Sequence, residues 1–267
     1  MYGAILGDII GEPYEFEKGP RSKVFPLFCE RPVFTDDSLM TIAICQGILE
    51  AGVDAGEDKM KESMIASMRR WGERHPYPAG GYGGGFARWL RSKNPEPYNS
   101  WGNGSAMRVA ATGWLFDTLE RTRQVARWSA EVTHNHPEGI KGAESVASVI
   151  WMARNGSPKD KIKSFVESEF NHDLSRTCDQ IRPTYKFDES CQGTVPEAIT
   201  AFLEGSDFED VIRTAVSLGG DCDTLTCIAG SMAEALYPIP ELLKEKCLDI
   251  ITDDIRQVLA AFDQLRT

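Results

Sequence analysis

The stretch FTDDSLMTIAICQGIL, residues 34–49, joins an acidic, hydroxyl-bearing opening to an apolar run with helical spacing. Its apolar residues recur every three or four positions, as on one face of a helix. Thr35 is a typical N-cap, and Asp36 and Asp37 complement the positive end of a helix dipole. The same oxygen atoms are also ligands that hard metal ions prefer. The stretch therefore predicts a helix start that is either a cap alone or half of a metal site.

The same periodicity recurs along most of the chain, whereas sustained two-residue alternation is hard to find. Gly52 and Gly156 are typical of helix ends, and Pro158 and Pro196 of helix starts. No linker, repeat or charge block divides the chain, so we expect an all-α protein with a single domain over residues 1–267. The helical windows are 5–10, 39–49, 60–71, 121–132, 138–155, 158–168, 195–204, 207–218, 223–236 and 241–265.

Composition excludes several classes of protein. A net charge of −11 with scattered Lys and Arg residues opposes a nucleic-acid surface. Seven cysteines without a CxxC pair are typical of a reducing cytoplasm. The first residues lack the basic region of a signal peptide, and no apolar run reaches the roughly 18 residues of a membrane span. We expect a cytoplasmic protein that does not bind membranes, with a monomer as the default state.

A second stretch, SLGGDCDTLTCIAGSMAEAL at 217–236, repeats the pattern of the first. Asp221, Asp223 and Thr224 follow a glycine turn and precede an apolar helical run. Capping alone explains both stretches if they lie apart. If they converge in a desolvated cleft, each close carboxylate pair would cost on the order of several kcal/mol, and a cation would remove that cost. Oxygen ligands without His or Cys favour Mg²⁺, Mn²⁺ or Ca²⁺ over Zn²⁺.

Two glycine-rich segments, 76–85 and 94–104, are candidate binding loops, whereas 171–196 is predicted to be a surface excursion. The glycines of GYGGG (81–85) suit either close approach of the backbone to a phosphate or a flexible loop. Trp101 could stack on a nucleotide or pack in the core. His134 and His136 lack further ligands at zinc-like spacing, which favours a neutral, hydrogen-bonding His134.

Six short motifs follow one another along the chain: GAILGDIIGEPYEFE (3–17), FTDDSLM (34–40), GYGGG (81–85), SWGNGSAMRVA (100–110), VTHNHPEGIKGA (132–143) and LGGDCDTLTCIAG (218–230). In this order they resemble the ADP-ribosylglycohydrolase family over residues 3 to about 237. The resemblance implies a compact, orthogonally packed all-α domain with a cleft that holds two Mg²⁺ or Mn²⁺ ions. It also implies cleavage of the bond between the distal ribose of ADP-ribose and a protein side chain or small acceptor.

The resemblance also implies roles for individual residues. Glu15 matches a glutamate near the metal centre, although a solvated turn residue after Pro13 is the alternative. Asp8 either supports the first helix or, as a functional residue, braces the site. Cys222 departs from the Thr, Ser or Ala that the family often has there; we expect its side chain to point away from the ions and to pack, with a redox-sensitive thiol as the alternative. The implied metal ligands are Thr35, Asp36, Asp37, Asp221, Asp223 and Thr224; the implied substrate contacts are Gly81, Gly83, Gly85, Ser100, Trp101, Asn103, Gly104 and His134.

The chemistry that the resemblance implies is hydrolysis at an anomeric carbon. Two ions would hold the 2- and 3-hydroxyls of the ribose and polarise a water molecule, and Glu15 or a metal-bound aspartate such as Asp37 would take its proton. The first expected acceptor is arginine, with serine, O-acetyl and nucleobase acceptors as alternatives. Two other classes remain open: a metal-dependent phosphohydrolase of nucleotide diphosphates, and a noncatalytic, crystallin-like member that binds ADP-ribose.

Overall fold

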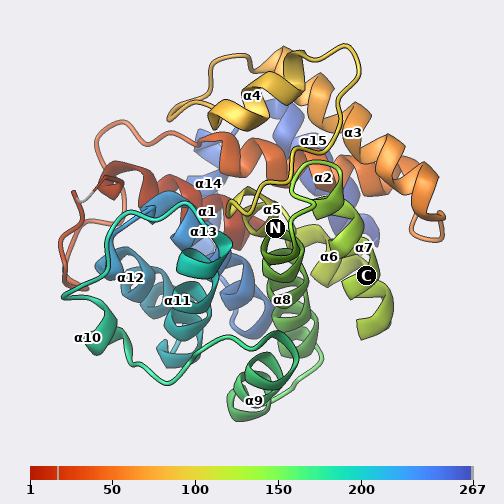
Figure 1. The fold of residues 1–267 in the computed structure, drawn as a ribbon. Helices are drawn as coiled ribbons and strands as arrows, with labels where there is room; N and C mark the ends of the chain where they lie inside the picture. Colours follow the sequence, from red (N-terminus) through yellow and green to blue (C-terminus); the bar gives the residue numbers. More distant parts are fainter. Residues whose placement is uncertain (17, 266–267) are drawn as a thin grey trace.

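A computed structural model describes residues 1–16 and 18–265, which form helices and no strand (Figure 1). The predicted all-α fold is confirmed. The helices are α1 (Tyr2–Gly11), η1 (a 3₁₀ turn, Glu12–Tyr14), α2 (Asp36–Ala51), α3 (Glu57–Arg74), α4 (Gly84–Arg91), α5 (Gly104–Met107), α6 (Ala110–Leu115), α7 (Leu119–Glu131), α8 (Pro137–Arg154), α9 (Lys159–Phe170), α10 (Cys178–Ile181), α11 (Cys191–Glu204), α12 (Phe208–Leu218), α13 (Cys222–Leu236), α14 (Glu241–Ile250) and α15 (Asp253–Leu265).

Two of the predicted helix boundaries are wrong. Pro196 does not start a helix but lies inside α11, which begins at Cys191 because the Ser190 side chain accepts a hydrogen bond from the Gly193 N–H (3.0 Å). The window 241–265 is two helices, since a new helix opens at Asp253 after the break at residues 251–252. The short helices α4, α5, α6 and α10 were not predicted, because four to eight residues show too little periodicity.

Helix α13 lies at the centre of the fold and contacts α1, α8, α11 and α12 (Figure 1). Its approach to α1 is unusually close, because glycines of α1 face its backbone. A Cβ atom at Gly7 would lie 2.1 Å from the Thr226 carbonyl oxygen, and one at Gly11 would lie 2.7 Å from the Asp223 Cα. This contact sets the position of the acidic start of α13 relative to the loop that follows α1.

Substituting Gly7 tests how much of the fold depends on this helix contact. Gly7→Ala is expected to lower the free energy of unfolding by about 2–3 kcal/mol, because the added methyl group collides with backbone that cannot shift freely. Urea denaturation measures the loss. Gly56→Ala is the control, since a Cβ there meets nothing within 4 Å among the described residues, and we expect a loss of about 1 kcal/mol or less, because alanine is a poorer N-cap of α3 than glycine. Equal effects of the two substitutions would contradict this account of the packing.

Buried apolar side chains form one cluster that includes residues from Met1 to Phe262. This continuity is compatible with the predicted single domain over 1–267. Two isolated β-bridges hold loops against the core. Ala79 pairs with Thr35, and Gly102 pairs with Ser190. The bridges bring the two glycine-rich segments to the starts of α2 and α11. Among the described residues, no helix is both long and apolar enough to cross a membrane.

Candidate active site

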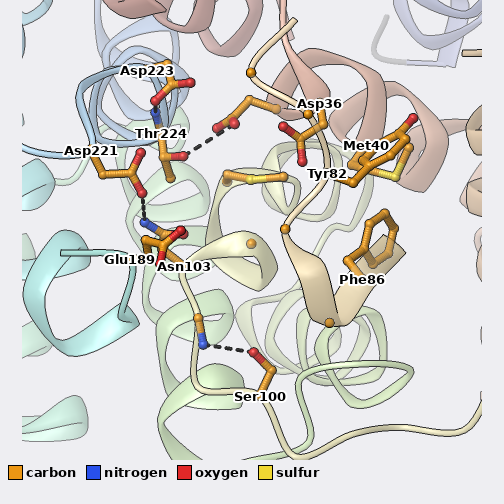
Figure 2. A pocket seen from close by; sticks show the side chains of 18 of the residues that line it. Asp36, Met40, Tyr82, Phe86, Ser100, Asn103, Glu189, Asp221, Asp223 and Thr224 are labelled. Carbon is orange, nitrogen blue, oxygen red and sulfur yellow. Dashed lines mark hydrogen bonds between the residues drawn. The ribbon is translucent and has the colours of Figure 1, made fainter. Parts of the chain in front are cut away.

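The two acidic helix starts meet in a cavity of about 350 Å³ (Figure 2). The Thr224 hydroxyl at the start of α13 donates to Asp37 Oδ2 at the start of α2 (3.3 Å). One ligand atom from each of Glu15, Asp221 and Asp223 lies within 4.8 Å of the other two. The structure thus brings together the residues that the sequence placed 184 or more positions apart, and Glu15 joins them from the turn after η1.

Asp8 braces the start of α2 from within α1. Its Oδ2 accepts from the backbone N–H groups of Thr35 (2.9 Å) and Ser38 (3.1 Å), and its Oδ1 accepts from the Thr35 hydroxyl (2.8 Å). Thr35 is also the N-cap of α2, since its Oγ1 accepts from the Asp37 N–H (3.2 Å). The capping interpretation is therefore correct for Thr35, and it is compatible with a ligand role for the aspartates that follow.

The start of α13 is shaped by a glycine turn and by an amide brace. Gly219 and Gly220 adopt φ values of +75° and +76°, which turn the chain sharply before Asp221. The Asn103 side chain donates to Asp221 Oδ2 (2.6 Å) and to the Thr194 hydroxyl (3.0 Å). Asn103 was predicted as a substrate contact, and the structure shows it holding a carboxylate in place.

Cys222 lies between the two aspartates of α13 and is fully buried. Its Sγ faces the Val216 carbonyl oxygen (3.8 Å) and the Thr226 hydroxyl (4.0 Å), away from the carboxylates. Burial raises the pKa of this thiol above its usual range. The Cys222 side chain is therefore part of the core, as the sequence predicted.

The carboxylates of the site repel one another. Burial, reinforced by the charges of neighbouring carboxylates, raises the pKa of Asp36, Asp37 and Asp223 well above the usual value. Burial and the Asp223 charge raise the pKa of Glu15 to about 7. Asp37 Oδ1 is buried and has no hydrogen-bond partner among the residues that the structure describes. An all-oxygen donor set with an unpartnered buried carboxylate oxygen fits a hard divalent cation such as Mg²⁺ or Mn²⁺.

This repulsion predicts how pH changes the effect of Mg²⁺ on stability. Burial raises the pKa of Asp8 and of Asp221 to about 6. Carboxyl groups whose pKa is raised in the folded state stabilise the metal-free protein fully at a pH below their unfolded-state pKa, which is about 4. This stabilisation is lost as the pH rises through their folded-state pKa of about 6–7. Saturating Mg²⁺, at roughly 100 times its Kd, should raise Tm by about 5–10 °C at pH 7.5 and far less at pH 4.5. Scanning calorimetry with and without chelator measures both shifts; equal shifts at the two pH values would contradict the prediction.

The glycine-rich loop forms another wall of the cavity, which Gly81, Gly83 and Gly85 line. A Cβ atom at Gly81 or Gly83 would meet nothing within 4 Å, so their bare backbone borders open space. Gly85 differs, because its Cβ would lie 2.8 Å from the Tyr98 ring. The loop ends where α4 begins, at Gly84. The exposed N–H groups at a helix start suit an anion, which is compatible with the predicted diphosphate site.

The segment 100–104 has one member that does not line the cavity. Ser100, Asn103 and Gly104 line it, whereas Trp101 is 53% exposed and lies edge-on against His136, with ring centroids 5.7 Å apart. The core-packing alternative for Trp101 is therefore wrong. Its substrate contact remains a prediction, and it would require a ligand that extends beyond the cavity lining.

The two histidines of THNHP, His134 and His136, have different structural roles. His134 is buried and lines the cavity. His136 caps α8, because its Nδ1 accepts from the Glu138 N–H (3.1 Å). Burial, with the charge of Arg108, lowers the pKa of His134 well below its usual range, so its ring is neutral. The structure agrees with the predicted neutral His134.

Several residues that line the cavity were not singled out from the sequence, among them Phe16, Arg108, Phe187 and Glu189. Arg108 lies in a quoted motif, and a single basic residue in the apolar run SAMRVAA was the available signal. Phe187 and Glu189 belong to 171–196, which is therefore not wholly a surface excursion. The segment reaches the cavity because the Asn103 N–H donates to the Glu189 carbonyl oxygen (2.7 Å), a long-range contact that periodicity does not reveal.

Comparison with known proteins gives a consistent family. The family model described as ADP-ribosylglycohydrolase matches residues 1–267. The chain is 26% identical to the ADP-ribosylhydrolase ARH3 of Mus musculus, over 97% of this chain and 90% of that protein. It is 26% identical to the ADP-ribosylarginine hydrolase Tri1 of Pseudomonas putida strain GB-1, over 90% of this chain and 70% of that protein. A solved ADP-ribosylglycohydrolase-related protein complex shares the fold, with a TM-score of 0.74, 22% identity, and coverage of 99% of this chain and 95% of that chain.

Proposed function

The chain belongs to the ADP-ribosylglycohydrolase family, and we propose that it hydrolyses the bond between the distal ribose of ADP-ribose and an acceptor, so reversing ADP-ribosylation. The observation that carries the proposal is the convergence of the two acidic helix starts with Glu15 in one cavity. ARH3 and Tri1, which are named as ADP-ribosylhydrolases, support the same reaction class.

The charges in the cavity suit a ligand that is anionic at one end. Arg108 is 1% exposed and lines the cavity, and its Nε has no hydrogen-bond partner within the described part of the chain. Burial lowers the pKa of its guanidinium to about 10, so it stays charged at neutral pH. Together with the N–H groups at the start of α4, this buried cation favours the diphosphate. Asp221 and Asp223, at the start of α13, lie across the cavity from Tyr82 and Phe86 (Figure 2).

The residues that would hold two divalent ions are those whose oxygen atoms converge at the starts of α2 and α13. When bound, such ions would supply the positive charge that favours ionised hydroxyl and water oxygens in the cavity. Asp8 holds the start of α2 in position, and Asn103 holds the Asp221 carboxylate at the start of α13, through the hydrogen bonds described above. The proposed ligands are Thr35, Asp36, Asp37, Asp221, Asp223 and Thr224, with Mg²⁺ or Mn²⁺ as the ion.

Glu15 is the proposed general base. Its carboxylate is half-buried and adjoins Asp221 and Asp223, and burial raises its pKa to about 7, the range in which a carboxylate accepts a proton effectively at neutral pH. Taking the proton of the attacking water leaves hydroxide character on the water oxygen, which attacks the anomeric carbon as the bond to the acceptor breaks. The departing acceptor takes up the proton that Glu15 has accepted, which restores the Glu15 carboxylate, and intact ADP-ribose is the other product.

The proposed acceptor is arginine. Glu15 and Glu189 give the mouth of the cavity negative charge, and Phe16 and Phe187 stack there with ring centroids 5.0 Å apart. A planar guanidinium can pair with carboxylates and stack on aromatic faces, whereas a serine hydroxyl gains from neither. Tri1, which is named as an ADP-ribosylarginine hydrolase, supports the same choice.

Product analysis tests the proposal against its alternatives. We expect incubation with ADP-ribosyl-arginine, ADP-ribosyl-serine and O-acetyl-ADP-ribose to release intact ADP-ribose, with arginine as the preferred acceptor and with loss of activity in chelator. AMP or inorganic phosphate as product would favour the phosphohydrolase. Binding of ADP-ribose in calorimetry without turnover of any substrate would favour a noncatalytic member of the family.

A further inference from the structure

His134 is joined to a buried arginine through one hydroxyl group. The Arg108 Nη2 donates to the Thr133 Oγ1 (2.6 Å), and the same Oγ1 lies 2.6 Å from His134 Nδ1. Arg108 is fixed in turn by the Ser129 carbonyl oxygen (2.9 Å). All four residues are at least nine-tenths buried, so water does not compete for these bonds. The side chains of Arg108, Thr133 and His134 thus form a hydrogen-bonded relay, and its last member, His134, lines the cavity.

The direction of the relay follows from which atoms can donate. A guanidinium is a donor only, so Thr133 Oγ1 must accept from Arg108. A hydroxyl has a single proton to give, and His134 Nδ1 is its hydrogen-bond neighbour among the described residues. Donation to Nδ1 satisfies the buried hydroxyl, whereas the opposite arrangement leaves its proton without an acceptor. Nδ1 is then the acceptor, and a neutral ring carries its proton on Nε2.

The other ring nitrogen faces the loop 100–104. A Cβ atom at Gly104 would lie 3.1 Å from His134 Nε2, and one at Gly102 would lie 3.5 Å from it. Because both residues are glycine, the space in front of Nε2 stays clear. The Tyr98 ring packs against the imidazole, with ring centroids 5.7 Å apart, and its backbone N–H donates to the Thr133 carbonyl oxygen (3.1 Å). The ring is therefore fixed in position and in orientation.

We propose that Arg108, acting through the Thr133 hydroxyl, fixes His134 as the tautomer protonated at Nε2, and that this N–H donates to an oxygen atom of bound ADP-ribose. Thr133 and Arg108 are positioning residues, since they act through His134. The ligand in this inference rests on the proposed function, whereas the tautomer does not. A ring free to exchange tautomers would present an acceptor to an oxygen-rich ligand for part of the time and would bind it less tightly.

Ring nitrogen chemical shifts and ligand affinity test the inference together. In ¹⁵N-labelled protein, long-range ¹H–¹⁵N spectra report the tautomer of each of the four histidines, and His134→Gln identifies the signals of His134. We expect protonated Nε2 in the unsubstituted protein and in Thr133→Ser, and loss of that preference in Thr133→Val. Calorimetry with ADP-ribose should show affinity about tenfold weaker for Thr133→Val and within about twofold for Thr133→Ser, as expected for one hydrogen bond.

Two controls separate positioning from structural damage. Thr112→Val removes an equally buried hydroxyl outside the cavity lining, where Thr112 Oγ1 donates to the Val109 carbonyl oxygen, and should leave ADP-ribose affinity unchanged. Mn²⁺ affinity, followed by electron paramagnetic resonance, should be the same in Thr133→Val as in the unsubstituted protein. A proton on Nδ1 in the unsubstituted protein, or full ADP-ribose affinity in Thr133→Val, would overturn the inference. Absence of ADP-ribose binding by the unsubstituted protein would instead contradict the proposed function, and the ring nitrogen shifts would still decide the tautomer.

Discussion

Asp37→Asn is expected to lower kcat/KM for ADP-ribosyl-arginine at least about a thousandfold, because the loss of a ligand carboxylate removes about 4 kcal/mol or more of transition-state stabilisation. The carboxylate of Asp37 is buried, and its Oδ2 accepts from the Thr224 hydroxyl, whereas its Oδ1 has no hydrogen-bond partner among the described residues. In this part of the chain no Lys or Arg pairs with Asp37, so we expect a bound cation to compensate its charge. Asparagine keeps the shape of the side chain but lacks the charge that holds the ion.

Stability distinguishes a metal ligand from a simple cap in the same variant. Burial and neighbouring carboxylates raise the pKa of Asp37, so removal of its charge should leave the metal-free protein equally stable or about 1 kcal/mol more stable. The stabilisation by Mg²⁺ should fall at the same time. Asp58→Asn is the matched control, because Asp58 is an exposed aspartate in the first turn of α3 and should matter only through the helix dipole. Full activity of Asp37→Asn in chelated buffer would refute the ligand role.

Glu15→Gln is expected to lower kcat by about 10²–10⁴-fold with little change in ADP-ribose affinity, because a general base acts on the transition state. Glutamine fills the same space but cannot take a proton from water. Steady-state kinetics on ADP-ribosyl-arginine and calorimetry with ADP-ribose separate the two effects. Mn²⁺ affinity shows whether Glu15 also contributes to holding an ion.

Glu12→Gln is the control for Glu15, because Glu12 lies in the adjoining turn η1 and does not line the cavity. We expect it to keep kcat within about threefold of the unsubstituted protein, the range typical of a substitution that touches no reacting group. A similar loss in both variants would mean that the turn as a whole, rather than the Glu15 carboxylate, supports activity. Unchanged kcat in Glu15→Gln would transfer the role of base to one of the aspartates.

The sequence predicts the parts of this protein that are local. The helices α2 and α13 begin where hydroxyl and acidic residues precede apolar periodic runs, and Thr35 caps α2 through a contact within two residues. The braces from Asp8 and Asn103 at these two starts come from distant parts of the chain. The all-α class follows from the same periodicity. Gly52, with φ of +85°, ends α2 as its residue type predicted. Local chemistry is sufficient for these features because capping and periodicity act over one or two turns.

The features that were missed depend on contacts between distant segments. Glu189 lies at the cavity because its carbonyl oxygen accepts a hydrogen bond from the Asn103 N–H, 86 positions away. This bond joins the segment 171–196 to the loop 94–104. Trp101 was equally compatible with the core and with a ligand, and only the packing of the loop shows that its ring is exposed. The role of Asp8 was open for the same reason, because its four hydrogen bonds to Thr35 and Ser38 depend on how α1 crosses α2.

A titration with Mn²⁺ shows directly whether the acidic starts of α2 and α13 form a two-ion centre for ADP-ribose release. Metal-free protein is titrated while bound Mn²⁺ is counted by electron paramagnetic resonance and ADP-ribose release from ADP-ribosyl-arginine is followed by chromatography. We expect two ions per chain and activity that appears as the sites fill. Full release of ADP-ribose by the chelated protein, or a release rate that does not follow Mn²⁺ occupancy, would contradict the two-ion centre.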